Sequence, residues 1–409
     1  MQWKGKKEQM MEEVGAFDPV PKEELLKRMD GLKGLMAKSG IDFGVIFQNV
    51  DEFYFTGTTQ KGVLVIPLHG EPLFFLEKSI ERGRLESPLD IIPIKKEKEI
   101  KEVLQSKGLL RGIAGLELDV LPVTAFERLK RNLGIDHYAD LAPCIREVRM
   151  VKSPFEITQL RKSGGMMAPV FEAARHAVRE GASEIDIEAA LIGIGRRHGH
   201  QGFLRMRGIN QEMTLMAVQA GYTGAMVTYA DVPIAGAGIT PAIPQGSSFK
   251  CVERGIPVTI DYGGGYNGYI TDETRTFVVG KLVEPFQRFY QCALEIIEDT
   301  MAYVKEGVEC TDVFARAYRI AEKASLQDYF MGHGEGQVSF IGHGIGLEIN
   351  ELPVITARHR RVLTEGMVFA FEPKFVLPGQ GAVGIELDFI VRKDKLERVT
   401  KDSFELVTV

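Results

Sequence analysis

The string VTIDYGGGYNGYITDETRTF, at residues 258–277, decides the fold of the second half of this chain. It carries two aspartates, Asp261 and Asp272, in a segment that otherwise has the composition of β-strands. A carboxylate in such a setting is unfavourable unless it is paired or bound to a metal. We predict a hairpin with strands at residues 257–262 and 269–279 and with its turn at the glycines 263–265. This hairpin would bring the two carboxylates together across the ladder, within reach of a shared metal ion.

Three later strings carry further residues of the same chemical kind: FIGHGIGLEINELP at 340–353, FAFEPKF at 369–375 and VGIELDF at 383–389. If the four carboxylates converge, each close pair repels by about 4 kcal/mol at an effective dielectric constant near 20. Two divalent cations would balance the four charges, and one imidazole suits a mostly oxygen-ligated pair of transition metals. The sequence therefore predicts a dinuclear metal site made of Asp261, Asp272, His343, Glu372 and Glu386.

A chain of 409 residues is long enough for two domains. Residues 1–152 alternate helical and strand-like patterns and predict an α/β domain with a structural role: a cap, a substrate wall or a dimer contact. Its elements are a helix beginning at residue 22 and short strands at FGVIF, GVLVIP, PLFFLE and DIIPI, residues 43–47, 62–67, 72–77 and 90–94. Residues 153–409 then form the second domain.

The second domain repeats its order of elements. Ser153 and Glu156 form a capping box around Pro154, which predicts a helix that continues to Gly181. A second helix is expected at 183–199, and another pair at 285–306 and 311–324. A strand–turn–strand segment with two of the carboxylates follows each helix pair. The stretch 220–248, rich in Gly, Ala and Pro, is an insertion in the first half; it predicts a substrate wall or lid, or else a surface excursion.

Composition excludes several classes of function. The net charge of −6 argues against nucleic acid as a partner, since phosphate binding requires a basic face. No stretch of 18 apolar residues predicts a membrane span, and the charged N-terminus lacks the apolar region of a signal peptide. The four cysteines lie far apart without a CxxC spacing, which favours reduced thiols. We therefore predict a cytoplasmic protein.

The sequence resembles the creatinase/prolidase/aminopeptidase P family of metallopeptidases over nearly its whole length. The strings that carry the resemblance are REVRMVKSPFEITQLRKSG, DYGGGYNGYITDETRTF, GHGIGLEINELP, EGMVFAFEPKF and the closing GIE. The resemblance implies an α/β N-terminal domain and a pita-bread catalytic domain, in which helices flank a curved antiparallel sheet with pseudo-twofold halves. It also implies a homodimer.

The resemblance further implies a role for each of the five residues. Asp261 would chelate the first metal, and Asp272 would bridge both metals. His343 and Glu372 would bind the second metal, and Glu386 would again bridge. Bound hydroxide is a nucleophile at neutral pH, and Glu372 is the candidate that carries its proton to the leaving nitrogen. The predicted function is peptide or amide hydrolysis of the Xaa-Pro aminopeptidase or dipeptidase type, with manganese as the metal and cobalt, iron or zinc as alternatives.

Several histidines common in this family are missing. Ser339 and Asn350 stand at two of these positions, no histidine occurs between His200 and His333, and Gly384 replaces a common arginine. Serine and asparagine cannot carry a proton near neutral pH. These departures support an alternative, in which the same metal site acts on a non-peptide C–N bond of a small metabolite, as in creatinase or ectoine hydrolase. A binding module without catalysis is a third hypothesis, opposed by the presence of all five residues.

Other polar residues have two possible roles. His198, His200 and His333 either replace the missing imidazoles in space or are surface histidines. Thr274 and Arg275 either support the metal ligands or belong to a surface strand pair. Asp388 is expected in a structural salt bridge, and the loop tyrosines Tyr222 and Tyr229 either line the substrate pocket or lie in solvent.

Overall fold

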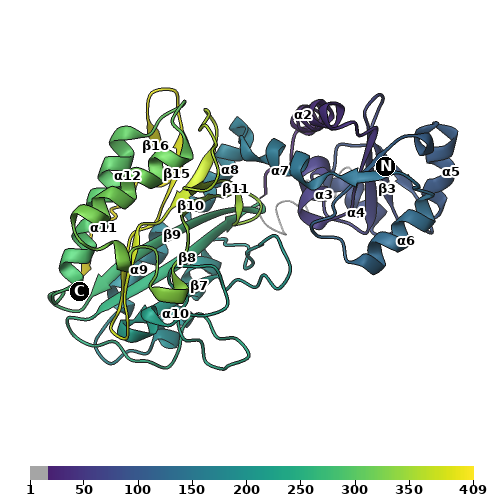
Figure 1. The fold of residues 1–409 in the computed structure, drawn as a ribbon. Helices are drawn as coiled ribbons and strands as arrows, with labels where there is room; N and C mark the ends of the chain where they lie inside the picture. The colour runs from purple at the N-terminus through teal and green to yellow at the C-terminus, as the bar shows by residue number, and fades with distance from the viewer. Residues whose placement is uncertain (1–16) are drawn as a thin grey trace. The chain divides into compact units, whose positions relative to one another are not determined.

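The computed structural model describes residues 17–409, which divide into two compact units (Figure 1). The first contains the described residues up to Arg149 together with Arg207–Gln211, and the second contains Met150–Met206 and Glu212–Val409. Most of the charged N-terminal segment, for which we predict no signal peptide, lies outside the described residues. None of the helices in the described part of the chain combines the length and the apolar character needed to cross a bilayer.

The first unit is built on a six-stranded mixed sheet with the strand order β4-β3-β2-β1-β5-β6. The predicted helix and the four predicted strands are confirmed. The strands are β1 (Phe43–Ile46), β2 (Gly62–Pro67), β3 (Leu73–Leu76), β4 (Ile91–Pro93), β5 (Ala114–Leu116) and β6 (Tyr138–Asp140). The helices are α2 (Lys22–Ser39), α3 (Asn49–Thr56), α4 (Ile80–Glu86), α5 (Glu99–Ser106), the 3-10 turn η1 (Leu109–Arg111), α6 (Val123–Leu133) and α7 (Ala142–Met150).

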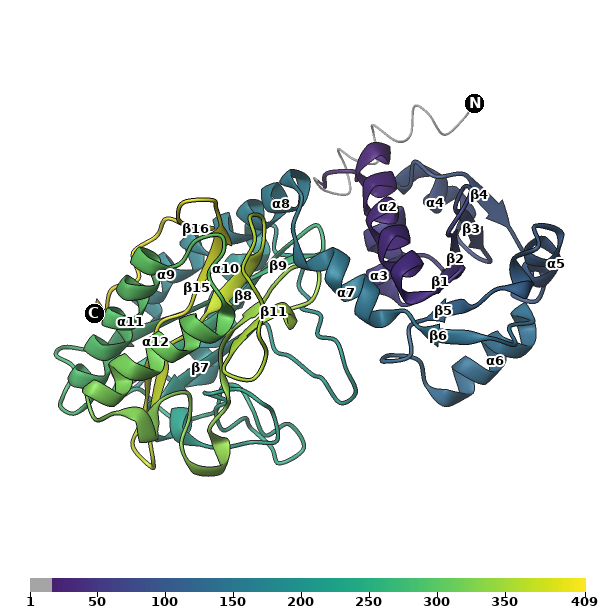
Figure 2. The ribbon, with the colours of Figure 1, turned by 45° about the horizontal axis from the view of Figure 1, so that its top comes forward.

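Helices cover both faces of this sheet (Figure 2). Phe43 and Val45 of β1 pack into one core with the apolar sides of α5 and α6. Gly44, between them, faces the other way, because an added Cβ there would lie 2.9 Å from Leu141 and 3.6 Å from the sulfur of Met36 on α2. This alternation follows from the two-residue period of a strand.

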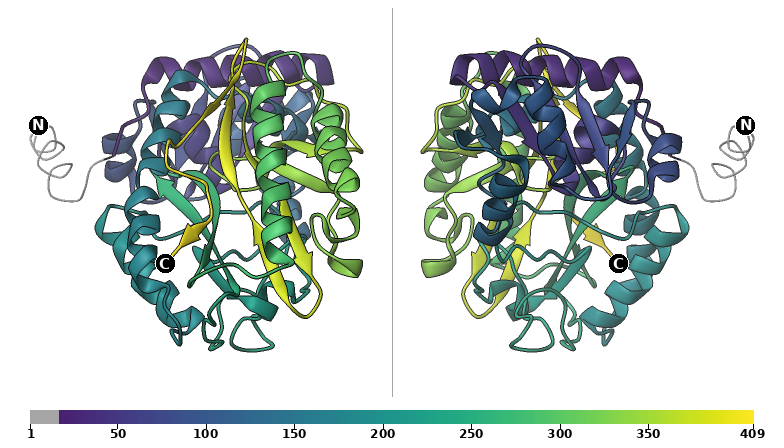
Figure 3. Two further views of the ribbon diagram at one scale, coloured as in Figure 1. Left: turned by 90° about the vertical axis from the view of Figure 1, so that its left-hand side faces the viewer. Right: turned by 90° about the vertical axis from the view of Figure 1, so that its right-hand side faces the viewer.

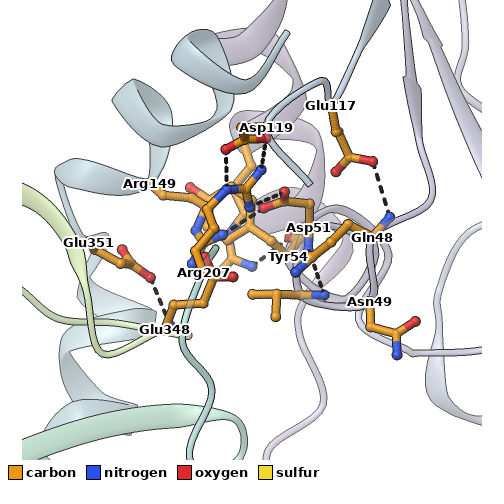
Figure 4. A network of polar contacts seen from close by, with 12 residues as sticks. Gln48, Asn49, Asp51, Tyr54, Glu117, Asp119, Arg149, Arg207, Glu348 and Glu351 are labelled. Carbon is orange, nitrogen blue, oxygen red and sulfur yellow. Dashed lines mark hydrogen bonds and ion pairs between the residues drawn. The ribbon is translucent and has the colours of Figure 1, made fainter. Parts of the chain in front are cut away.

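A buried ion network joins α3 to two arginines of the same unit (Figure 4). Asp51 accepts hydrogen bonds from Arg149 at 2.6 Å and from Arg207 at 2.8 Å. Arg207 also donates to both carboxylate oxygens of Asp119, at 2.6 and 2.9 Å. Burial disfavours the charged form of Asp51, but the two guanidinium groups outweigh it and lower the pKa of this carboxyl. Arg207 thereby fixes residues 207–211 to the first unit.

Glu52, the neighbour of Asp51, is buried without a cationic partner among the described contacts. Burial raises its pKa to about 8, although the backbone N–H of Gln60 donates to Oε1 at 3.3 Å. Because the pKa of this carboxyl is higher in the folded than in the unfolded chain, its protonated form stabilises the fold. The stabilisation by protonated Glu52 is fully present below about pH 4.5, the ordinary pKa of a glutamate side chain. It is lost as the pH rises through about 8, the pKa in the folded chain.

We therefore expect Glu52→Gln to raise the melting temperature of the first unit by several degrees at pH 8 and hardly at all at pH 4.5. Thermal unfolding followed by calorimetry at four pH values between these limits measures the difference. Glu102→Gln, at an exposed position of α5, is the matched control and should shift the melting temperature little at any pH. A gain for Glu52→Gln that does not grow with pH would contradict the assignment.

The predicted capping box at Ser153 is confirmed and begins α8 (Pro154–Gly165) of the second unit. Ser153 Oγ accepts from the N–H of Glu156 at 3.2 Å, and Glu156 Oε2 accepts from the N–H of Ser153 at 3.0 Å. The predicted continuation to Gly181 is wrong, because a new helix, α9 (Ala168–Ala177), follows after a break at residues 166–167. Pro169 explains the break, since proline is tolerated in the first turn of a helix but not in its interior.

The first half of the second unit continues with α10 (Glu184–Arg197), which begins at Ser183 as predicted. It is followed by β7 (Met216–Ala220), the 3-10 turn η2 (Gly221–Ala225), β8 (Pro257–Tyr266) and β9 (Tyr269–Val278). With the C-terminal strand β17 (Val407–Thr408), these form a sheet with the order β17-β9-β8-β7. Apolar side chains from α9, α10 and this sheet form its core.

The predicted hairpin of β8 and β9 is present, but its turn was misplaced. The turn lies at Asn267 and Gly268, whose φ angles of 50° and 86° favour asparagine and glycine. The three glycines lie inside β8. A Cβ at Gly264 would lie 2.3 Å from Thr271 Oγ1 and 3.0 Å from the carbonyl oxygen of Ser163. Glycine is therefore required for the close approach of α8 to the strand, not for a turn.

The second half repeats the order of a helix pair followed by strands. The two green helices of this pair lie side by side (Figure 3). The helices α11 (Phe286–Tyr303) and α12 (Cys310–Lys323) match the predicted pair, and their apolar sides share one core with the strands. A five-stranded sheet has the order β11-β10-β12-β15-β16, and β13 pairs with β14. The remaining elements are η3 (Gln327–Tyr329), η4 (Gly334–Gly336), β10 (Phe340–Gly344), β11 (Glu351–Thr356), β12 (Val368–Phe371), β13 (Lys374–Leu377), β14 (Gly381–Gly384), β15 (Leu387–Val391) and β16 (Leu396–Arg398).

Candidate metal centre

The five residues of the predicted site meet in the second unit, where its two halves join. Asp261 lies on β8, Asp272 on β9 and His343 on β10, whereas Glu372 precedes β13 and Glu386 precedes β15. Backbone hydrogen bonds hold the last two in place. The N–H of Glu372 donates to the carbonyl of Ile341 at 2.9 Å, and the N–H of Glu386 donates to the carbonyl of Thr274 at 3.1 Å.

The register of β8 and β9 puts both aspartates on one face. Asp261 pairs with Thr274, and Gly263 pairs with Asp272. Because paired residues of antiparallel strands share a face, and residues two apart on a strand do so as well, Asp261 and Asp272 are diagonal neighbours. The two aspartates were predicted to lie close together in a hairpin with its turn at residues 263–265. The turn lies elsewhere, but the observed pairing of β8 and β9 still brings them together.

His343 faces three of the carboxylates at the spacing of ligands around one ion. Its Nε2 lies 3.8 Å from Glu372 Oε1 and 4.0 Å from both Asp272 Oδ2 and Glu386 Oε1. Two ligand atoms that each lie about 2.1 Å from a common ion are separated by at most about 4.2 Å. Asp272, His343 and Glu386 form a group that can hold a metal ion, with one ligand atom from each residue. The donor set therefore fits one divalent cation.

A lysine that the sequence analysis overlooked also reaches this cluster. Lys374 Nζ lies 2.8 Å from Glu372 Oε2, 2.8 Å from Glu386 Oε2 and 3.2 Å from Asp261 Oδ2. Its side chain is only 3% exposed. The string FAFEPKF contained the signal: a lysine in an apolar strand needs a partner, and residues two apart in an extended chain point the same way.

The cluster concentrates negative charge in a buried place. Burial and the charges of Glu386 and Asp261 raise the pKa of Asp272 well above its usual value. Burial lowers the pKa of the Lys374 ammonium, but the surrounding carboxylates outweigh it and raise that pKa well above normal. The three carboxylate oxygens around Nζ thus favour the charged form of Lys374.

Neighbouring polar groups orient the carboxylates. Thr274 Oγ1 donates to Glu386 Oε2 at 2.8 Å, and Arg275 donates to the backbone carbonyl of Glu386 at 2.9 Å. Asp388 Oδ2 accepts from the N–H of Asp272 at 2.9 Å. Thr274 and Arg275 thus support the site, whereas Asp388 makes a hydrogen bond to the backbone here in place of the salt bridge that was expected.

The three candidate substitutes for the missing imidazoles have other roles. His200 is buried, its Nε2 donates to the carbonyl of Gly263 at 2.8 Å, and its Nδ1 accepts from the N–H of Gly202 at 2.9 Å. His198 and His333 are exposed, and each has Nδ1 near a backbone carbonyl of its own segment. None of the three has a contact with the five clustered residues among the described interactions.

Residues between 224 and 235 of the insertion line a cavity of about 310 Å³ together with residues 333–336, Val376, Pro378 and Gly379. None of the five clustered residues lines this cavity. Tyr222 and Tyr229 are also absent from its lining, and they are 49% and 57% exposed. The insertion is thus a wall of a separate cavity, and its predicted role as a substrate wall stays a prediction.

Carboxylates and one imidazole gathered on a helix-flanked sheet are the donor set of a metal-dependent hydrolase. The chain matches the family model for the Creatinase/Prolidase N-terminal domain over residues 28–151, and that of metallopeptidase family M24 over residues 158–393. The second match covers more than half of the chain. This protein therefore belongs to metallopeptidase family M24 and is an enzyme of that family, which confirms the resemblance read from its sequence.

Individual relatives agree over almost the full length. The Xaa-Pro dipeptidase of Pyrococcus furiosus is 29% identical over 384 residues, which are 93% of this chain and 99% of the relative. The prolidase structure from Pyrococcus horikoshii has a TM-score of 0.78 at 26% identity and covers 93% of this chain and all of that one. The Xaa-Pro dipeptidase structure from Bacillus anthracis has a TM-score of 0.80 at 25% sequence identity. The match covers 94% of this chain and all of that one. These likenesses confirm the predicted α/β fold with a pita-bread domain.

Proposed function

We propose that this chain hydrolyses the peptide bond of short Xaa-Pro peptides, as a dipeptidase or aminopeptidase, at the cluster in residues 153–409. The observation that carries the proposal is the geometry around His343, whose Nε2 faces three carboxylates at 3.8–4.0 Å. The similarity to the Xaa-Pro dipeptidase of Pyrococcus furiosus supports the Xaa-Pro substrate class.

Asp272, His343, Glu372 and Glu386 would hold a divalent cation, and Asp261 would complete the donor set. A bound cation supplies Lewis acidity and lowers the pKa of a coordinated water. Glu372 would accept the proton of the attacking water and deliver it to the leaving nitrogen. Its Oε2 accepts from Lys374 at 2.8 Å, which fixes the carboxylate in one orientation. The two-ion count predicted from the sequence stays a prediction.

Manganese is the metal we propose, with cobalt, iron and zinc as alternatives, since the donor set is rich in oxygen and has one imidazole. We also propose a homodimer and a cytoplasmic location. The family resemblance supports the dimer, and the dispersed cysteines support a reducing compartment.

A panel of Xaa-Pro dipeptides and Xaa-Pro-Xaa tripeptides tests the proposed substrate class. With Mn²⁺ added, we expect turnover of at least one Xaa-Pro substrate and little turnover of the matching Xaa-Ala peptides. Removal of the metal with a chelator should abolish the activity, and Mn²⁺ should restore it.

An absence of turnover on every peptide, with metal demonstrably bound, would refute the Xaa-Pro assignment. It would favour the second candidate, hydrolysis of a non-peptide C–N bond in a small metabolite. Ser339 and Asn350, which stand where imidazoles were expected, are the observation that favours this candidate.

A further inference from the structure

The ammonium group of Lys374 lies among three of the clustered carboxylates. We propose that this ammonium group permanently replaces one of the two cations that these carboxylates would otherwise bind, so that the chain holds a single divalent ion. That ion would lie on the His343 side of the cluster. The inference rests on the proposed metal ligands and is independent of the substrate.

The hydrogen-bonding capacity of the ammonium group is fully used. A lysine ammonium has three donors and no acceptor. Lys374 Nζ has three carboxylate oxygens within 3.2 Å, one each from Asp261, Glu372 and Glu386. Each donor therefore has one charged acceptor. A divalent ion in the same position would have to displace the ammonium from all three oxygens.

The two glutamates divide their oxygens between the lysine and the histidine. In Glu372 and in Glu386, Oε2 faces Lys374 at 2.8 Å, and Oε1 faces His343 Nε2 at 3.8 and 4.0 Å. A carboxylate that bridges two cations uses its oxygens in this way. Here one of the two cationic positions is filled by the protein itself.

The strand pairing reserves the space that the lysine needs. Lys374 on β13 pairs directly with Gly384 on β14. A Cβ at Gly384 would lie 2.5 Å from Lys374 Cγ and 3.0 Å from its Cα. The N–H of Met331 donates to the carbonyl of Lys374 at 2.8 Å and fixes the backbone from the other side. The absence of a side chain at 384 thus gives the lysine stem its path to the carboxylates.

The balance of charges in the cluster also favours a single divalent ion per chain. Four carboxylates, from Asp261, Asp272, Glu372 and Glu386, carry four negative charges, which one ammonium and one divalent ion reduce to one. Two divalent ions beside the ammonium would exceed the negative charge by one. They would also place a divalent ion within a few ångströms of a fixed positive charge in a buried site, where repulsion is weakly screened.

Metal stoichiometry tests this proposal without any substrate. The protein is loaded with excess Mn²⁺, passed through a desalting column and analysed by elemental analysis. We expect one equivalent per chain for the wild type and two for Lys374→Ala, which removes the charge and opens the space. Electron paramagnetic resonance should show an isolated Mn²⁺ in the wild type and two spin-coupled ions in the variant.

Lys152→Ala is the matched control. Lys152 is another buried lysine of the second unit and pairs with Glu351 at 3.1 Å, away from the five clustered residues. Lys152→Ala should still bind one Mn²⁺ per chain. Lys374→Arg should also bind one, because arginine keeps the positive charge. Circular dichroism establishes that each variant is folded.

Two equivalents, or none, in the wild type would overturn the proposal, as would a single equivalent in folded Lys374→Ala. If that variant does not fold, the wild-type count and spectrum still decide between one ion and two. One bound ion without peptidase activity would refute the proposed function and leave this inference standing.

Discussion

Glu372→Gln is expected to lower kcat/KM on an Xaa-Pro substrate by roughly 10²- to 10⁴-fold, the usual contribution of a general base. Glutamine keeps the shape of the side chain but cannot accept the proton of the attacking water. It also weakens the contact with Lys374, which now ends at a neutral oxygen or faces the amide NH₂ group. The measurement is kcat/KM with Mn²⁺ in excess, together with the metal content of the variant.

Two results would separate the roles of this residue. Loss of activity with the metal retained would assign Glu372 to proton transfer, whereas loss of both would make it chiefly a metal ligand. Glu322→Gln, at an exposed position of α12, is the control. Its kcat/KM should stay within about twofold of the wild-type value, because a surface substitution away from the clustered residues has little effect. A fully active Glu372→Gln with bound metal would remove this residue from the proposed chemistry.

Asp51→Asn is expected to destabilise the first unit by about 3–5 kcal/mol, the usual effect of breaking a buried ion pair. The reason is that Arg149 and Arg207, which are 3% and 5% exposed, would lose their shared charged acceptor. Chemical denaturation at pH 7 measures the change. The effect should shrink as the pH falls from the ordinary carboxyl value of 3.8 through the lowered pKa of Asp51, because the unfolded chain takes up the proton first and the folded wild type loses the same charge only at lower pH.

The control for this prediction is the ion pair of Arg84 and Glu81, whose side chains are 52% and 53% exposed. Arg84→Met should change the free energy of unfolding by at most about 1 kcal/mol, because exposed ion pairs contribute little. An equally small effect for Asp51→Asn would contradict the role assigned to the buried network.

The sequence was sufficient where a local signal decides the structure. The capping box at Ser153 and the strand patterns of the first unit are of this kind. It misled where one residue type has two uses. The glycines after Asp261 were predicted to form a turn, but they lie inside β8, where Gly264 allows the close approach of Ser163 on α8 and Gly263 and Gly265 face Leu204 and Gln201.

Lys374 was missed for a different reason. A carboxylate cluster can be neutralised by a metal ion alone, so the sequence pattern did not require the basic residue two positions after Glu372 as a counter-charge. The role of Arg207 was beyond local reasoning altogether, since its partners Asp51 and Asp119 lie more than 80 residues earlier in the chain.

The position of Arg207 has a consequence for synthesis on the ribosome. A nascent chain that has reached residue 150 already contains Asp51 and Arg149, but the second guanidinium group emerges only 58 residues after Arg149. At about 5–20 residues per second, that interval lasts roughly 3–12 seconds. During it, Asp51 faces one arginine alone, so the N-terminal part of the nascent polypeptide reaches its final stability only after translation of the next part is well under way.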